Sequence, residues 1–284
     1  MAEITIAGIM RAPSFSPNHI GNDAAIFNLV ADQLRKRGCI VNVYSEEQLA
    51  AGLVTEKIVV NMCREQRSIR TLQQMEDEGA VVVNSGYGIE NCTRERMARI
   101  LMGRNIPYPD TIIVDTNEGI SSALAKAGIT RCWIKRGDFH TMHKEDVSFA
   151  RHPQEAQELL QEYFLRGITR AVINRHIDGD LIKFYGVRDS NFFYYFNPMS
   201  GQSAADAATT AEFDSERLAA ICRRAADEMD IDIYGGDCVI SPDGTITMID
   251  FNDWPSFAPC RAQAAPVIAR RIISIIRQHN TSAR

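Results

Sequence analysis

The first 88 residues alternate between short apolar runs and amphipathic stretches, and this alternation limits the fold more than any other feature. The runs EITIAGI, CIVNVYS, KIVVNMC and AVVVNSG have the length and β-branched content of strands. Ile26, Leu29, Val30 and Leu34 fall on one face of a helix that is expected to end near Gly38. Strands separated by helices predict a parallel, doubly wound sheet.

Ligands of such sheets bind at the carboxyl ends of the strands. The polar stretch 10–23 follows the first strand and is expected to form a loop. Polar and cationic residues gather at this rim, where they either bind a substrate or simply form the loops. They are Arg11, Asn18, Asn22, Asn61, Arg64, Asn84 and Ser85.

Beyond residue 88 the pattern predicts two further lobes. The smaller one, 89–170, begins with a helix capped by Thr93 and ended by RNIPYP, continues through the strands TIIVD and RCWIKRGD, and includes helices near 118–127 and 153–165. The carboxyl-terminal lobe, 171–284, is expected to contain antiparallel strands, a loop over 199–213, a helix over 218–229, the hairpin YGGDCVISPDGTITMIDFN and the helix APVIARRIISIIRQ. The predicted domains are therefore 1–88, 89–170 and 171–284.

The hairpin carries two carboxylates and an amide near one end. Counting inward from the turn PDG places Asp237 beside Asp250, with Asn252 on the same face. Two carboxylates side by side in an apolar hairpin repel each other unless a cation neutralises them. An all-oxygen set suits magnesium, which completes its shell with water and phosphate oxygens. The alternative is that Asp250 and Asn252 cap the turn NDWP while Asp237 binds a backbone amide.

Four motifs in this order, over residues 84–257, resemble the ATP-grasp superfamily. The hairpin resembles its metal-binding signature, and TRERMARILMGRNIPYP resembles its helix that ends in Gly-Ile-Pro-x-Pro. Lys135 in CWIKRGD corresponds to its small-lobe lysine. The segment VINRHIDG corresponds to the linker that lines its adenine pocket, which implies Asn174, Arg175, His176 and Ile177 as nucleotide-binding residues.

The resemblance implies an ATP-grasp fold, in which an N-terminal doubly wound parallel-sheet domain precedes two α+β lobes that clamp ATP. It also implies one or two magnesium ions, or manganese instead, on the hairpin oxygens. Lys135 and Arg94 are expected to contact ATP, with Arg94 in place of the usual lysine. Lys183, a lysine among apolar neighbours, is expected to meet a phosphate or the substrate.

Three departures from the family pattern affect the expected site. The loop after Lys135 has one glycine, so His140 and its neighbours are expected to cover the phosphates with side chains. The strand NFFYYFNPM lacks the arginine that ligases place near the acyl phosphate, and Arg188, Arg175 or Arg261 would replace it. Asp250 stands where most members of the family have glutamate. The inositol polyphosphate kinases of this superfamily also have aspartate at this position.

The implied reaction is a carboxylate-amine ligation, in which ATP forms an acyl phosphate that an amine converts to an amide or peptide bond. Arg11, Asn18, Arg64, Ser85 and His140 are the expected substrate-binding residues. One alternative is a kinase of a polyol or sugar phosphate, which the Asp-x-Asn pair and LIKFYGV favour. Others are a non-catalytic nucleotide-binding module, and an unrelated α/β protein in which the motif order is coincidental.

The composition of the chain limits which kinds of partner it is expected to bind. A formal net charge of −5 and a pI near 5.7 argue against bulk nucleic-acid or anionic-membrane binding, so small molecules are the expected partners. No apolar run approaches the ~20 residues of a membrane span and no leader is evident, which predicts a cytoplasmic protein. Seven cysteines without a CxxC pair indicate neither a disulfide framework nor a zinc site. The sequence does not determine whether the chain forms a homodimer.

Overall fold

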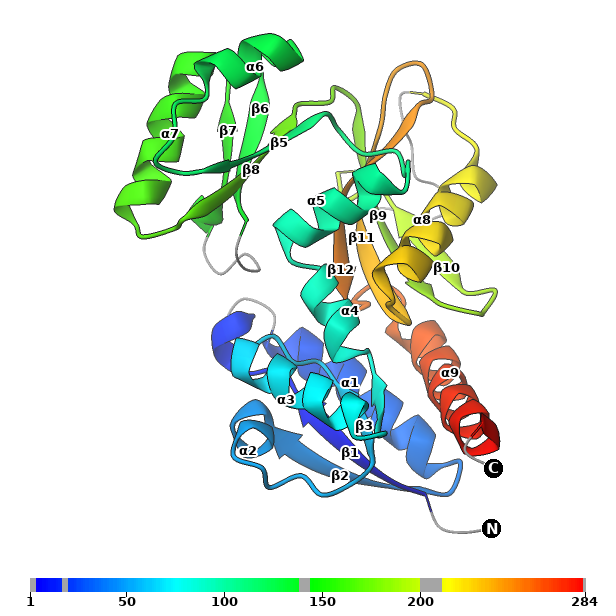
Figure 1. The fold of residues 1–284 in the computed structure, drawn as a ribbon. Coiled ribbons are helices and arrows are strands. Elements are labelled where there is room, and N and C mark those ends of the chain that lie inside the picture. The colour runs from blue at the N-terminus through cyan, green and yellow to red at the C-terminus, as the bar shows by residue number, and fades with distance from the viewer. Residues whose placement is uncertain (1–3, 17–19, 138–143, 200–210, 283–284) are drawn as a thin grey trace.

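Three four-stranded sheets, each with its own helices, build the part of the chain that the computed structural model describes. That part comprises residues 4–16, 20–137, 144–199 and 211–282. In Figure 1 the first sheet lies at the bottom, the second at the upper left and the third at the upper right. The three sheets therefore define three lobes.

The first sheet is parallel, with strand order β2-β1-β3-β4. Its strands are β1 (Ile4–Met10), β2 (Cys39–Ser45), β3 (Ile58–Asn61) and β4 (Val81–Val83). One face packs on α1 (Ile20–Arg35) and the other on α2 (Glu46–Ala50), α3 (Gln66–Asp77) and α4 (Gly86–Asn91). Helices on both faces confirm the doubly wound parallel sheet.

The loop expected over residues 10–23 is shorter than predicted. A single 3-10 turn, η1 (Pro13–Phe15), follows β1, and α1 already begins at Ile20. Asp23 lies in the first helical turn, where the helix dipole favours an acidic side chain, and it forms an ion pair with Arg11. The helix therefore includes polar residues that the sequence placed in the loop.

The second sheet is antiparallel, with strand order β5-β8-β6-β7. Its strands are β5 (Thr111–Asp115), β6 (Cys132–Arg136), β7 (Val147–Ala150) and β8 (Arg170–Arg175). The 3-10 turn η2 (Lys144–Asp146) precedes β7, and α6 (Ser121–Ala127) and α7 (Pro153–Leu165) cover the sheet. Because β8 pairs with β5 and β6, this sheet extends past residue 170, where the sequence placed the limit of the lobe. The strand β7 was not predicted.

The third sheet is also antiparallel, with strand order β10-β9-β11-β12. Its strands are β9 (Asp180–Val187), β10 (Phe193–Phe196), β11 (Ile233–Ile240) and β12 (Ile246–Asp253). One face packs on α8 (Ser215–Met229) and on α5 (Arg94–Gly103), whose Met97 and Leu101 are fully buried. The helix α5 precedes the second lobe in the sequence, yet it completes the core of the third. The predicted loop 199–213 falls largely on residues outside the described part.

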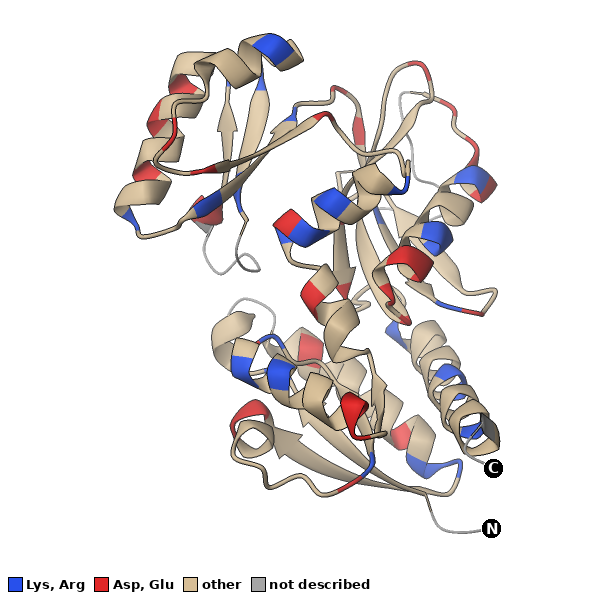
Figure 2. Ribbon diagram, viewed as in Figure 1, with Lys and Arg blue, Asp and Glu red and all other residues tan. Residues whose placement is uncertain are grey.

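The last helix, α9 (Arg261–Ser282), runs back from the third lobe to the first (Figure 1). Its Ile268, Ile272 and Ile276 join the buried core that α1 forms with the parallel sheet. None of the described helices combines the length and apolarity needed to cross a bilayer. Figure 2 shows acidic residues along α7 and basic residues along α9.

Candidate functional site

The face of the third sheet opposite α5 and α8 carries a row of charged side chains. Asp237 on β11 stands directly opposite Asp250 on β12, and Lys183 on β9 stands opposite Asp237 on its other side. Asn252 donates from Nδ2 to Oδ2 of Asp250 over 3.3 Å. This register confirms the predicted pairing of the two carboxylates.

A β-bulge at this point turns Asp250 toward the row. Asp237 pairs with Asp250 and Cys238 pairs with Met248, so Ile249 is the extra residue of β12. Met248 is fully buried in the core behind the sheet, whereas Asp250, two residues further, faces the other side. Without the bulge the alternation of a strand would direct both side chains to one face.

Each carboxylate of the pair has a cationic neighbour. Nζ of Lys183 lies 2.8 Å from Oδ1 of Asp237, and Nη2 of Arg94 lies 3.5 Å from Oδ2 of Asp250. Burial raises the pKa of Asp237 in spite of Lys183. Burial would also raise the pKa of Asp250, but Arg94 and Lys135 outweigh it and hold that pKa below its usual value. Asp250 therefore stays ionised at neutral pH.

Lys135 reaches this row from the second lobe. It lies on β6, its side chain is buried, and its Nζ donates to the backbone oxygen of Ile249 over 2.8 Å. Burial, together with the nearby positive charge of Arg94, lowers the pKa of Lys135 to about 8. The ammonium group is thus held between the second and third lobes, beside Asp250.

The free oxygens of the row suit a magnesium ion. Oδ2 of Asp237, Oδ1 of Asp250 and Oδ1 of Asn252 have no hydrogen-bond partner among the described residues. Carboxylate and amide oxygens are the ligands that magnesium prefers. The donor set therefore fits the ion that the sequence predicted.

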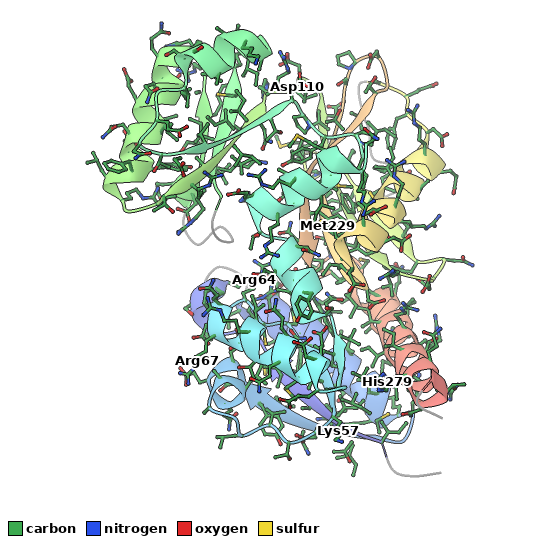
Figure 3. The ribbon with its side chains drawn as sticks, viewed as in Figure 1. Lys57, Arg64, Arg67, Asp110, Met229 and His279 are labelled. Carbon is green, nitrogen blue, oxygen red and sulfur yellow. The ribbon has the colours of Figure 1, made fainter. Side chains whose placement is uncertain are left out.

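The linker residues predicted to line an adenine pocket lie at the end of β8 and in the connection that leads to β9. Arg175 is bound within the second lobe, to Asp110 over 2.8 Å and to the backbone oxygens of residues 127 and 128. His176 accepts a 3.0 Å hydrogen bond from the indole of Trp133, and Ile177 is half-buried. Asn174 donates to the hydroxyl of Thr111 over 2.7 Å. Figure 3 shows Asp110 where the second and third lobes meet.

Several other predicted site residues are not brought to the carboxylate row. Arg188 forms ion pairs of 2.8 and 3.0 Å with Asp227 and Asp230, at the end of α8. The hydroxyl of Ser85 caps α4. Arg261, at the start of α9, donates to the side chain of Asn22 and to the backbone of residue 256. Asn18 and His140 lie outside the described residues.

A buried ion cluster joins the first lobe to the end of β12, and the sequence did not reveal it. Arg11 lies 3.1 Å from Asp23 and 3.5 Å from Asp253, and Arg64 lies 3.5 Å from Asp253. Arg11 also donates to the backbone oxygen of Trp254 over 3.1 Å. Figure 3 places Arg64 at the end of the first lobe that faces the others. The sequence feature that could have indicated this cluster is Asp253 itself, a third carboxylate directly after Asn252.

Tyr108 is a second residue that the sequence did not single out. It lies in the connection between α5 and β5, close enough to Asp250 for that charge to add to burial in raising the pKa of the phenol. Its position between two prolines, in IPYP, was the available signal. Tyr108 therefore belongs to the surroundings of the carboxylate row.

No protein-family model and no curated protein sequence matches the chain. Solved structures do match over nearly the whole length. The D-alanine-D-alanine ligase from Coxiella burnetii superposes with a TM-score of 0.74 at 14% identity, covering 99% of this chain and 97% of the ligase. The D-alanine-D-alanine ligase from Bacillus anthracis complexed with ATP gives 0.71 at 15% identity, covering 99% and 98%. The chain has the ATP-grasp fold.

The ATP-grasp ligase PsnB, complexed with a minimal precursor, Mg and ADP, has the same architecture. Its TM-score is 0.64 at 16% identity, and the match covers 95% of this chain and 97% of PsnB. Identities this low establish a shared fold. These matches confirm the predicted fold class. They exclude the alternative of an unrelated α/β fold in which the motif order is coincidental.

Proposed function

We propose that this protein is an ATP- and magnesium-dependent ligase that joins a carboxylate to an amine through an acyl phosphate. The observation that carries the proposal is the row formed by Lys183, Asp237 and Asp250, which faces Arg94 and Lys135 where the second and third lobes meet. A metal-binding carboxylate pair beside two buried cations suits a nucleotide triphosphate. The matched structures are ligases by name, one with ATP and one with Mg and ADP.

In the proposed reaction ATP lies between the second and third lobes. Lys135 and Arg94 neutralise the phosphates while a substrate carboxylate oxygen attacks the γ-phosphorus, which releases ADP and leaves an acyl phosphate. The nitrogen of the amine then attacks the acyl carbon, phosphate departs, and the nitrogen loses a proton. Positioning and charge carry both steps, so no covalent protein nucleophile is required.

The hairpin would hold one or two magnesium ions, with manganese as an alternative, through Asp237, Asp250 and Asn252. Bound there, the metal would supply positive charge to the transferring phosphoryl group. Lys183 neutralises Asp237 over 2.8 Å, which keeps this buried position compatible with a second carboxylate opposite. The linker 174–177 is proposed to bind adenine. A cytoplasmic location and the domain limits stay predictions.

The test is mass spectrometry after incubation with magnesium ATP and a pool of amino acids, other carboxylates, amines and polyols. A product whose mass equals two components minus water, formed together with ADP, is the expected result. A phosphate added to one component would identify a kinase instead. ADP bound without any product would indicate a nucleotide-binding module. The Asp250→Asn variant serves as the control that should form no product.

A further inference from the structure

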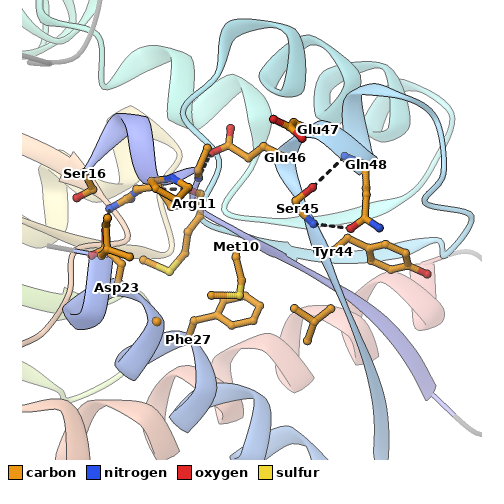
Figure 4. A pocket seen from close by; sticks show the side chains of 16 residues that line it. Met10, Arg11, Ser16, Asp23, Phe27, Tyr44, Ser45, Glu46, Glu47 and Gln48 are labelled. Carbon is orange, nitrogen blue, oxygen red and sulfur yellow. Dashed lines mark hydrogen bonds and ion pairs between the residues drawn. The ribbon is translucent and has the colours of Figure 1, made fainter.

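A pocket of about 420 Å³ opens in the first lobe, between α1 and the carboxyl ends of β1 and β2 (Figure 4). Met10, Phe27 and Met62 supply apolar lining. Two further apolar side chains of the lining stay exposed, with Ile20 48% and Val43 45% accessible to solvent. Small-molecule sites have volumes of this order and mostly apolar walls, and they occur at this end of α/β sheets.

The polar side chains of the pocket give it an acidic excess. One arginine, Arg11, lines the pocket together with Asp23, Glu46 and Glu47. Arg11 is already paired with Asp23 and with Asp253. The side chain of Glu47 is exposed and has no hydrogen-bond or ion-pair partner among the described residues. Glu46 is 1% exposed and accepts from the backbone N–H groups of residues 12, 64 and 65, so Glu47 is the acidic side chain of the pocket that would repel a substrate carboxylate and attract an ammonium group.

One lining residue, Arg11, links the pocket to the strand that carries the candidate metal ligands. Arg11 lines the pocket and at the same time contacts Asp253 and the backbone oxygen of Trp254, at the end of β12. Asp253 directly follows Asn252. Arg11 therefore connects the wall of the pocket with the end of β12.

We infer that this pocket binds the amine partner of the ligation, an amine with an apolar body. The apolar body lies against Phe27 and Val43, and the ammonium group faces Glu47. The inference rests on the proposed function, because the ligation requires an amine substrate, and it names the chemical class of that amine. Under this inference Arg11 does not bind the substrate carboxylate, because its guanidinium group already pairs with Asp23 and Asp253.

Two probes with the same branched apolar body test this inference. They are 4-methylpentylamine and 4-methylpentanoate, whose binding to the full chain is measured by ligand-observed NMR without ATP. Val43→Trp fills the pocket. Ile40→Trp is the matched control, because Ile40 lies on the same strand, is 39% exposed and is absent from the lining.

We expect the amine to bind the wild type and Ile40→Trp more tightly than the carboxylate does. Val43→Trp should weaken amine binding roughly tenfold or more, which corresponds to about 1.4 kcal/mol. Glu47→Gln should reduce the ratio by which the amine binds more tightly than the carboxylate. No binding of the amine, equal binding of both probes, or unchanged binding by Val43→Trp would overturn the inference.

The binding assay separates this inference from the proposed function. If the protein forms condensation products but Val43→Trp binds the amine like the wild type, the ligase proposal stands and the pocket inference fails. If Val43→Trp loses the amine but no product forms with magnesium ATP, the pocket assignment survives as an amine site and the ligase proposal fails.

Discussion

Lys135 donates a 2.8 Å hydrogen bond to the backbone oxygen of Ile249, although the two residues belong to different lobes. Ile249 is the extra residue of the β-bulge in β12, so its carbonyl group is released from the regular strand ladder. The same bulge turns the side chain of Asp250 toward Lys135. One local irregularity thus creates both the contact between the lobes and the orientation of the carboxylate pair.

The low pKa of Lys135 predicts a basic limb in the pH profile. Because the pKa is about 8, raising the pH through this value deprotonates the side chain and removes a charge that would contact phosphate. We expect kcat/KM for ATP to fall above about pH 8, as measured by ADP release. Lys135→Arg should keep its charge and extend the plateau. An identical fall in Lys135→Arg would contradict this assignment.

The lowered pKa of Lys135 should make the folded protein more stable at high pH, whereas it should make the enzyme less active there. The folded-state pKa of Lys135 lies near 8 and its ordinary value is 10.5, so the unfolded chain binds more protons between these limits. The contribution of Lys135 to the free energy of unfolding should therefore increase as the pH rises from about 8 to 10.5. Urea titrations across this range should show a rise that Lys135→Met lacks. Equal slopes for both proteins would argue against the shift.

Asp250→Asn should abolish turnover and leave the fold intact. The substitution removes one charge of the proposed metal site, and we expect a loss of at least about a thousandfold in ATP turnover. Circular dichroism checks the fold, and Asp32→Asn, at a carboxylate of α1 that is 58% exposed, is the matched control. Most of the activity remaining would disprove the metal role. Loss of the fold would support the alternative that Asp250 caps a turn.

Asp253→Asn should destabilise the protein strongly. Asp253 is 1% exposed and pairs with Arg11 and Arg64, so its neutralisation leaves Arg64 without its countercharge and leaves Arg11 with Asp23 alone. We expect a loss of about 3–5 kcal/mol in the free energy of unfolding, measured in urea. Asp115→Asn, at a pair whose carboxylate is 50% exposed, should cost less than about 1 kcal/mol. Similar losses in both variants would show that the cluster is not a buried ionic anchor.

Gly236→Ala should destabilise the hairpin through a steric clash. A Cβ atom at Gly236 would lie 2.2 Å from the backbone oxygen of Asp250, which has little freedom to move. We expect a loss of about 1–3 kcal/mol, together with reduced activity because Asp250 is displaced. Gly103→Ala has no atom within 4 Å of the added Cβ and lies in α5, so it should be neutral or slightly stabilising. Thermal unfolding of both variants distinguishes these outcomes.

The sequence determined the features that depend on local order along the chain. The strand and helix alternation of residues 1–88 predicted the parallel sheet, because apolar periodicity reports burial within each element. Residue counting across the turn PDG paired Asp237 with Asp250, because a hairpin links the two strands within a few residues. Lys183 was singled out by its apolar neighbours, and it lies opposite Asp237.

Tertiary structure alone decided which distant residues meet. Arg188 was expected near the phosphoryl group, but the strand β9 carries it to Asp227 and Asp230 at the end of α8. Arg11 was expected to face substrate, but it pairs with Asp253, more than two hundred residues away. The sequence also gave no sign of the bulge at Ile249 or of the contact that Lys135 makes there. Such contacts depend on how the three lobes pack against one another, and the periodicity of one element carries no information about its distant neighbours.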